Sequence, residues 1–218
     1  EVLYRRYLGG SALASHFLLR DVKPGIDPLG PENPLVIMTS VINGLALSGA
    51  NRYTAAAKSP LTGGFGEAEA GGYWGPEFKR TGFDGMIVHG QSEKPVYLYV
   101  ADGGCEIRDA SKYWGQLADV VQDGLEAEIG DKKICVLQTG VAGENKVLYA
   151  AMTNQLRHFH GRSGLGAVMG SKLLKAIVVR GKERLVPSSR EETNGVVKWF
   201  REHYDQEGDR YHQTGTAG

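Results

Sequence analysis

The sequence predicts an α+β fold: a duplicated, two-lobed β-sheet domain with short helices. Three observations support this fold class. Short β-branched or aromatic runs bounded by Gly, Pro or Asp recur along the chain, with only a few helical periodicities between them. The two halves of the chain repeat the same order of segments. Glycine makes up 31 of 218 residues, about twice its average share of roughly 7%, while the 41% of apolar residues and the lack of a Gly-X-Y period exclude disordered and collagen-like chains.

The strands are predicted where β-branched or aromatic runs lie between turn residues. In chain order they are 35–39, 52–57, 85–89, 96–101, 105–108, 133–138, 147–152 and 175–180. Helices are predicted where apolar residues recur three and four positions apart, which is the case at 3–19, 74–81, 116–129, 164–174 and 190–206. Before the last helix, Ser189 and Glu192 form a capping box. Its apolar stripe consists of Val196, Val197, Phe200 and Tyr204.

The repeat is weak in sequence but keeps its order. The segment 36–44 resembles 136–143, and 51–58 resembles 145–152. A glycine-rich stretch, a short helix and a strand follow in each half, and corresponding segments lie 91 to 99 residues apart. A true duplication predicts two related lobes about a pseudo-twofold axis, each with a glycine-rich loop. The alternative is a chance similarity between glycine-rich strand–loop segments.

The two glycine-rich loops, 59–75 and 161–172, are the candidate binding elements. Glycine lets main-chain N–H and C=O groups approach a ligand closely, and a helix start aims free N–H groups at an anion. The loops therefore predict a site for a phosphate-bearing or flat heterocyclic cofactor. They contain neither GxGxxG nor a P-loop, since Gly170-Ser-Lys reverses the P-loop ending. The alternative is that these glycines serve bulges and tight packing.

Few single residues carry chemistry on their own. Arg52 on a predicted strand can hold a phosphate or ring carbonyl, or can lie solvated at a sheet edge. His158 and His160 share one face of an extended segment, but no third metal ligand lies near them in sequence. Cys105 and Cys135 form no CxxC pair and are interpreted as reduced packing residues. No Ser-His-Asp or paired-carboxylate pattern is present.

Charge and hydropathy exclude several classes of protein. The 25 basic and 25 acidic residues balance, which argues against a nucleic-acid or membrane-surface face. No run of 18 apolar residues occurs, so we expect no membrane span and a cytoplasmic location. Both ends of the chain look cut. We expect a piece of a longer protein, with a domain at 1–185 and the start of a following helical domain at 186–218.

Several motifs in register resemble one family. They are Tyr7-Leu-Gly-Gly10, Pro24 to Asn33, Lys58 to Gly66, Ala70 to Lys79, Gly82 to Gly85, Glu93 to Tyr97, Glu106 to Ser111, Ala142 to Asn145 and Gly164 to Lys172. Together they cover about residues 5–182 and resemble the N-terminal domain of the aldehyde:ferredoxin oxidoreductase family, the tungsten-pterin enzymes.

The resemblance implies that the fold forms a pterin-binding base. It implies an oxidoreductase with one tungsten, or molybdenum, between two pterins, with magnesium and with a [4Fe–4S] cluster bound by C-terminal domains outside this chain. It further implies that an aldehyde is oxidised to a carboxylate, with ferredoxin or an iron–sulfur subunit as electron partner, and that the protein is a homo-oligomer. This chain alone is expected to be inactive, and no catalytic residue is assigned to it.

The resemblance also implies the cofactor-binding residues. They are Arg52, Glu69, Gly71, Gly72, His158, Phe159 and Gly161, with the main-chain carbonyls of Glu69 and Phe159 on magnesium. The chain departs from the family at His158, where the family has an arginine. Two other functions stay open: a stand-alone pterin- or phosphate-binding module without catalysis, and the tungsten subunit of an aromatic acyl-CoA reductase.

Overall fold

The computed structural model describes residues 2–214, with side chains through residue 204. Its helices are α1 Val2–Tyr7, α2 Gly10–Asp21, α3 Trp74–Lys79, α4 Ala118–Ile129, α5 Val141–Glu144, α6 Leu165–Ser171 and α7 Arg190–Thr214, with a 3-10 turn at Ser111–Tyr113. Its strands are β1 Leu35–Thr39, β2 Tyr53–Lys58, β3 Phe65–Ala70, β4 Gly85–Val88, β5 Val96–Ala101, β6 Gly104–Asp109, β7 Cys135–Thr139, β8 Met152–Asn154, β9 His158–His160 and β10 Leu174–Arg180.

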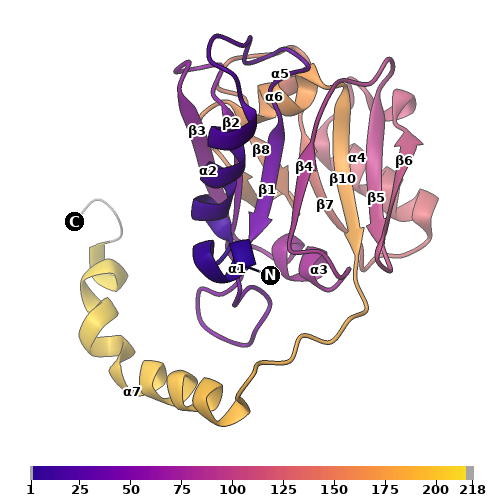
Figure 1. Cartoon of the computed structure of the whole chain (residues 1–218). Coiled ribbons are helices and arrows are strands. Elements are labelled where there is room, and N and C mark those ends of the chain that lie inside the picture. Colours follow the sequence, from indigo (N-terminus) through magenta and orange to yellow (C-terminus); the bar gives the residue numbers. More distant parts are fainter. Residues whose placement is uncertain (1, 215–218) are drawn as a thin grey trace.

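Two sheets make up the domain, and they confirm the predicted α+β fold of two related lobes (Figure 1). The first sheet has the order β3-β2-β1-β4, and all of its neighbours are antiparallel. The second sheet contains β9-β8-β7-β10, the same antiparallel arrangement in the same chain order. The hairpin β5–β6 extends the second sheet, with β5 parallel to β10. The duplication is therefore present in the strand topology.

Register shows where the sequence alignment of the repeat was wrong. Met38 lies opposite Thr54 in the first lobe, and Gln138 lies opposite Thr153 in the second. The second strand of the second repeat is thus Met152–Asn154 and not 147–152. The carbonyl of Ala150 accepts a hydrogen bond from the Gly166 amide at 2.9 Å. Because this main-chain group bonds to the start of α6, the segment before Met152 cannot join the ladder there.

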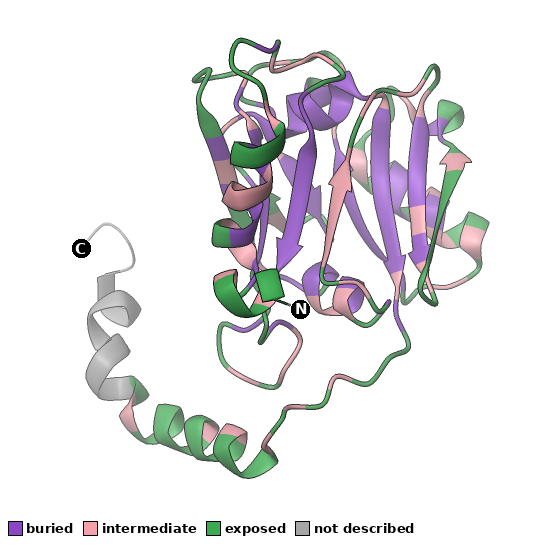
Figure 2. Ribbon diagram, in the orientation of Figure 1, coloured by how far each residue is buried: buried purple, intermediate pink, exposed green. Residues whose placement is uncertain are grey.

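The main core lies between the two sheets, and smaller cores lie under α2 and α4. Figure 2 shows the central strands buried and α7 mostly exposed. The main core includes a row of stacked aromatic rings from the first lobe, in which the ring centroids of Tyr53 and Trp74 lie 4.8 Å apart. Trp74 also donates from Nε1 to the Ile177 carbonyl on β10 at 3.0 Å. This packing fixes the two lobes to each other.

Three other predicted features need correction. Residues 65–70 form the strand β3, although the sequence placed them in a glycine-rich loop. The predicted helix 3–19 is broken between α1 and α2, because Gly9 has φ +81° and a Cβ there would overlap the Thr39 carbonyl. Cys105 is exposed and is not a packing residue, whereas Cys135 is buried. Burial raises the pKa of the Cys135 thiol to about 12.

The last helix begins as the capping box predicts. Ser189 Oγ accepts a hydrogen bond from the Glu192 amide at 3.1 Å, and α7 starts at Arg190. Its predicted apolar stripe stays largely open, with Val196 55% and Tyr204 46% exposed. Across residues 2–214, no helix combines the length and the apolar character that a membrane span requires.

Candidate cofactor-binding site

The edge strands β3 and β9, one from each lobe, lie beside each other. Side chains tie the two edges together. Ser163 Oγ donates to the Glu67 carbonyl at 3.2 Å, and Asn154 Nδ2 donates to the Gly71 carbonyl at 3.2 Å. No ladder hydrogen bonds join β3 to β9 among the described residues. The junction therefore keeps main-chain groups of both lobes available to a ligand.

The phase of the ladders shows which main-chain groups these are. On β3, the Ser59 amide donates to the Gly64 carbonyl, so alternate residues from Gly64 onward bond to β2. The groups of Glu67 and Glu69 consequently face away from β2, toward the junction. On β9, Phe159 pairs with Thr153. The Gln155 amide donates to the Val136 carbonyl, so Gln155 and Val136 are a hydrogen-bonded pair of the β7–β8 ladder. Bonded pairs alternate, so the main-chain groups of Thr153 also bond to β7 and not to β9. The main-chain groups of Phe159, opposite Thr153, therefore face outward.

Glu69 and Phe159 hold equivalent places in the two lobes. Glu69 lies opposite Thr54, and Phe159 lies opposite Thr153, the residue that matches Thr54 in the repeat. The spacing of the repeat in the sequence does not align these two residues, but the strand pairing does. Two carbonyl groups related by the duplication thus point out of the two neighbouring edges.

A hollow of about 520 Å³ opens at this junction. It is lined by Arg52, Glu67, Ala68, Glu69, Phe159, Gly161 and Arg162. Four of the seven residues that the sequence analysis assigned to a cofactor are among them, and they come from both lobes. The structure therefore brings together residues that lie about a hundred positions apart in the chain.

Two arginines and two glutamates give the hollow its charge. Arg52 Nη1 lies 4.0 Å from Glu69 Oε2, with the side chains 62% and 49% exposed. At this distance and exposure the ion pair is weak, so the Arg52 guanidinium is available to another anion. Glu67 accepts a hydrogen bond from the Ser11 hydroxyl of α2. Its carboxylate is thereby bound to the protein.

Gly71, Gly72 and His158 lie next to the hollow but do not line it. Gly72 has φ +88°, and a Cβ there would lie 2.6 Å from both Asn154 Oδ1 and His158 Cδ2. A Cβ on Gly71 would lie 3.9 Å from His158 Nδ1. These three residues join the lobes directly, so glycine at position 72 is required by packing.

A buried polar group of three side chains adjoins the lobe junction, where Asn154 donates to the Gly71 carbonyl. Asn154 Nδ2 donates to the Tyr53 hydroxyl at 2.9 Å, and the His160 ring packs edge-on against Tyr53 with centroids 4.7 Å apart. His160 is fully buried, and neither ring nitrogen has a hydrogen-bond partner. Burial lowers its pKa to about 4, so the ring is neutral at physiological pH. His158 and His160 share a face as expected, and the described residues contain no cluster able to hold a metal ion directly.

The glycines of the second loop divide into two kinds. A Cβ on Gly164, Gly166 or Gly170 would overlap main-chain atoms of Leu148, Ala151 or Gly143, respectively. Tight packing therefore explains these three glycines, which agrees with the alternative that the loop glycines serve bulges and packing. A Cβ on Gly161 would approach only the Phe159 Cβ, at 4.0 Å. Gly161 therefore leaves open space at the wall of the hollow.

Glu67, Ala68 and Arg162 also line the hollow and were not predicted from the sequence. Glu67 and Glu69 are two positions apart, so they share a face only if 65–70 is a strand. The glycine-rich composition around this segment hides that alternation in the sequence. Arg162 directly follows Gly161, and a cation inside a glycine-rich loop was the available signal for it.

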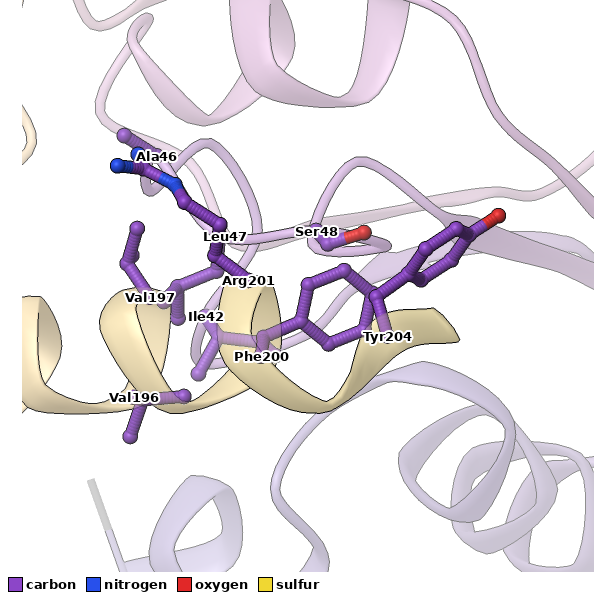
Figure 3. A pocket seen from close by; sticks show the side chains of 9 residues that line it. All are labelled: Ile42, Ala46, Leu47, Ser48, Val196, Val197, Phe200, Arg201 and Tyr204. Atoms are coloured by element: carbon purple, nitrogen blue, oxygen red, sulfur yellow. The ribbon is translucent and has the colours of Figure 1, made fainter. Parts of the chain in front are cut away.

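A second hollow of about 620 Å³ lies elsewhere, between α7 and the segment 41–50 (Figure 3). Its lining is mostly apolar and comprises Ile42, Ala46, Leu47, Ser48, Val196, Val197, Phe200, Arg201 and Tyr204. It includes none of the predicted cofactor residues. The smaller, charged hollow at the lobe junction is therefore the candidate site.

Comparison with known proteins gives related chains. Residues 1–181 match the family described as "Aldehyde ferredoxin oxidoreductase, N-terminal domain". The tungsten-containing aldehyde ferredoxin oxidoreductase of Pyrococcus abyssi is 45% identical over 185 residues, which are 85% of this chain and 30% of that protein. The "aliphatic sulfonate oxidoreductase, WOR-like subunit" of Pyrococcus furiosus is 34% identical over 196 residues, covering 83% of this chain and 31% of the relative.

A solved structure has the same fold. It is the active site complex BamBC of benzoyl coenzyme A reductase in complex with 1,5 dienoyl-CoA. The TM-score is 0.90 at 35% sequence identity, and the match covers 94% of this chain and 31% of that chain. The present chain thus spans about a third of the length of the proteins it matches.

Proposed function

Because this chain belongs to the aldehyde ferredoxin oxidoreductase family, as its N-terminal domain, we propose that it is the cofactor base of a tungsten or molybdenum bis-pterin oxidoreductase. The whole enzyme oxidises an aldehyde to a carboxylic acid and passes the electrons to ferredoxin. One observation carries the proposal: residues of both lobes, Arg52, Glu69, Phe159 and Gly161, line a single hollow at the lobe junction. A binding surface made of two related lobes suits a cofactor that contains two pterins.

The residues present fit such a cofactor. The Arg52 guanidinium is exposed and only weakly paired, so it can bind a phosphate or a pterin carbonyl in a fork. Gly161 leaves room for a flat ring to approach the main chain. The carbonyl groups of Glu69 and Phe159 face outward from the two edges, and carbonyl oxygens are ligands that magnesium accepts. These two carbonyl groups would hold magnesium, whose positive charge would offset the negative charge of cofactor phosphates.

In this proposal the chain positions the cofactor and performs no chemistry itself. The metal–pterin group supplies two-electron oxidation and reduction when bound. The chain's residues hold the two halves of the cofactor in one orientation through main-chain groups, Arg52 and the packing of Gly71 and Gly72 under His158. A [4Fe–4S] cluster, the catalytic residues and the substrate pocket belong to the part of the protein that follows. Residues 1–185 form the base in this scheme, and 186–218 begin the following helical domain.

The test is metal and pterin content of the full-length protein purified without oxygen. We expect tungsten or molybdenum together with pterin in the unmodified protein, and a clear loss of both in Arg52→Ala. Arg184→Ala is the matched control, because Arg184 is an exposed arginine outside the hollow. Both variants should match the unmodified protein in thermal stability, since surface substitutions change stability by about 0.5 kcal/mol or less. An unmodified protein without either metal, or an Arg52→Ala protein with full cofactor content, contradicts the proposal.

The tungsten subunit of an aromatic acyl-CoA reductase is a second candidate. The observation that favours it is the match to the BamBC structure, with a TM-score of 0.90 over 94% of this chain. The two functions share the cofactor base and differ in substrate. Assay of the loaded protein with a small aldehyde and with an aromatic acyl-CoA separates them. A stand-alone module would bind pterin and turn over neither substrate.

A further inference from the structure

Arg52 lies just beyond the end of the ladder that joins β2 to β1. The register between the two strands ends with Thr39 opposite Tyr53. Ser40 is the next residue that would lie opposite Arg52, and the phase of the ladders would make these two a hydrogen-bonded pair. The Ser40 carbonyl instead accepts a hydrogen bond from the main-chain amide of Asn43 at 3.1 Å. The ladder thus stops one residue short of Arg52.

The side chain of Asn43 takes the place of the missing strand partner. Asn43 is fully buried, and its Nδ2 donates to the Arg52 carbonyl at 2.7 Å. The loop that carries Asn43 is closed by its own main chain, because the Gly44 amide donates to the Ala50 carbonyl at 3.2 Å. Gly75 of α3 leaves room for the asparagine, since a Cβ there would lie 3.1 Å from Asn43 Nδ2. Asn43 therefore fixes the main chain at Arg52 from outside the strand.

The position of the Arg52 side chain depends on this main-chain geometry. Alternate residues of a strand share a face. An extended main chain at residue 52 therefore places Arg52 on the face of Thr54 and of Glu69, which lies opposite Thr54. The side chain itself is weakly held, because it is 62% exposed and its guanidinium lies 4.0 Å from Glu69 Oε2. A shift of the chain by one residue would turn the guanidinium to the other face, away from the hollow.

A second asparagine completes the opposite end of β2 and makes a different set of contacts. Continuing the register places Pro34, which has no N–H, opposite Lys58. Asn33 supplies both missing groups: its Oδ1 accepts from the Lys58 amide at 3.0 Å, and its Nδ2 donates to the Lys58 carbonyl at 2.9 Å. In contrast, Asn43 Oδ1 is buried and has no hydrogen-bond partner among the described residues. An unpaired buried carbonyl costs free energy, and the fold tolerates this cost at the residue that holds Arg52.

We propose that Asn43 is a positioning residue of the cofactor site, whose side-chain amide holds the Arg52 main chain in strand geometry and thereby keeps the guanidinium at the hollow. This inference rests on the proposed role of Arg52 and adds a residue that does not itself line the hollow. Asn43 contacts no ligand and acts through Arg52. Loss of the amide should therefore affect cofactor retention more than its effect on stability explains.

Hydrogen exchange in the full-length protein tests the contact between Asn43 and Arg52. In Asn43→Ala we expect amide exchange at residues 50–53 to be about fivefold faster, because one hydrogen bond is lost. Exchange at residues 54–58 should stay unchanged, since the ladder with β1 is intact. Asn43→Thr keeps a hydrogen-bond donor and should fall between Asn43→Ala and the unmodified protein. Unchanged exchange at residues 50–53 in Asn43→Ala, or an Asn43→Ala protein that does not fold, overturns the proposal.

Cofactor content tests the link from Asn43 to the site. We expect purified Asn43→Ala to hold about fivefold less pterin and less tungsten or molybdenum than the unmodified protein, and Asn43→Thr to hold more than Asn43→Ala. Asn33→Ala is the matched control at the other end of β2. Its urea midpoint should fall at least as far as that of Asn43→Ala, because Asn33 makes three side-chain hydrogen bonds, but its cofactor content should be normal.

The two asparagine variants separate a positioning role from a structural one. A structural role alone would lower cofactor content in both variants in proportion to their stability. Equal cofactor content in Asn43→Ala and Asn33→Ala therefore overturns the proposal. An unmodified protein without pterin and without either metal overturns the proposed function instead, and the exchange at residues 50–53 still decides whether Asn43 holds Arg52.

Discussion

At the scale of single residues, two glycines of the candidate site have opposite roles. Gly161 borders open space in the hollow, whereas Gly72 has positive φ and contacts side chains of the second lobe. We predict that Gly161→Leu leaves the melting temperature of the chain within about 2 °C but prevents pterin binding in the full-length protein. The reason is that the added side chain fills the hollow and not the core.

Gly72→Ala is the contrasting variant. It adds strain at φ +88° and a Cβ at 2.6 Å from Asn154 Oδ1, so we predict a loss of about 2 kcal/mol or more of unfolding free energy. Urea denaturation and pterin quantification separate the two effects. A Gly161→Leu protein that retains full pterin would show that the hollow is not the binding surface.

The buried His160 predicts a specific pH dependence. Burial lowers its pKa from 6.5 to about 4, so between those values the unfolded chain binds a proton that the folded chain does not. Stability therefore falls as pH is lowered from 6.5 to 4, by up to about 1.4 kcal/mol per pH unit. His160→Phe should flatten this part of the stability profile in urea titrations. An equal slope in the His160→Phe protein would contradict the assignment.

At the scale of elements, glycine serves the contact between short helices. A Cβ on Gly170 of α6 would overlap the carbonyl of Gly143 in α5, whereas Gly195 in α7 has no neighbour within 4 Å of such a Cβ. We predict that Gly170→Ala costs about 3 kcal/mol, because a main-chain atom cannot move aside as a side chain can. Gly195→Ala should instead favour its helix by about 0.5–1 kcal/mol. Chemical denaturation measures the first effect and circular dichroism the second; equal behaviour of the two variants would refute the packing argument.

The helices and strands differed in how accurately the sequence predicted them. Strands such as β1 and β5 were predicted with their observed bounds, because their β-branched and aromatic residues are buried on a sheet. β3 was not predicted, since Gly66, Ala68 and Ala70 give no hydrophobic alternation. Those small residues are selected by the close approach of neighbouring segments: a Cβ on Gly66 would lie 2.8 Å from the Cβ atoms of Ser59 and Ser163. Local strand propensity contains no information about a contact with a residue about a hundred positions away.

At the scale of the whole molecule, α7 lies outside the core of the two-lobed domain. None of its residues 190–204, whose side chains the structure describes, belongs to the three core clusters. We predict that a chain ending after Leu185 keeps its melting temperature within about 3 °C and its sheet content, as a domain boundary near 185 requires. A chain ending after Ser171 lacks the central strand β10 and should not fold. A large loss of stability on removing 186–218 would contradict that boundary.

The sequence alone predicted the fold class, a duplication with chance similarity as its alternative, and the resemblance to a family, because hydrophobic periodicity, segment order and short motifs can be read directly along the chain. It also named Arg52, Glu69, Phe159 and Gly161, but only by resemblance. The tertiary structure decided which of the candidate residues share one hollow, and which glycines pack and which leave space. It also decided that Glu69 and Phe159 are equivalent, through the phase of two separate ladders. These properties depend on how the edge strands β3 and β9 meet across the lobe junction. No local sequence pattern encodes the contact between segments that lie about ninety residues apart.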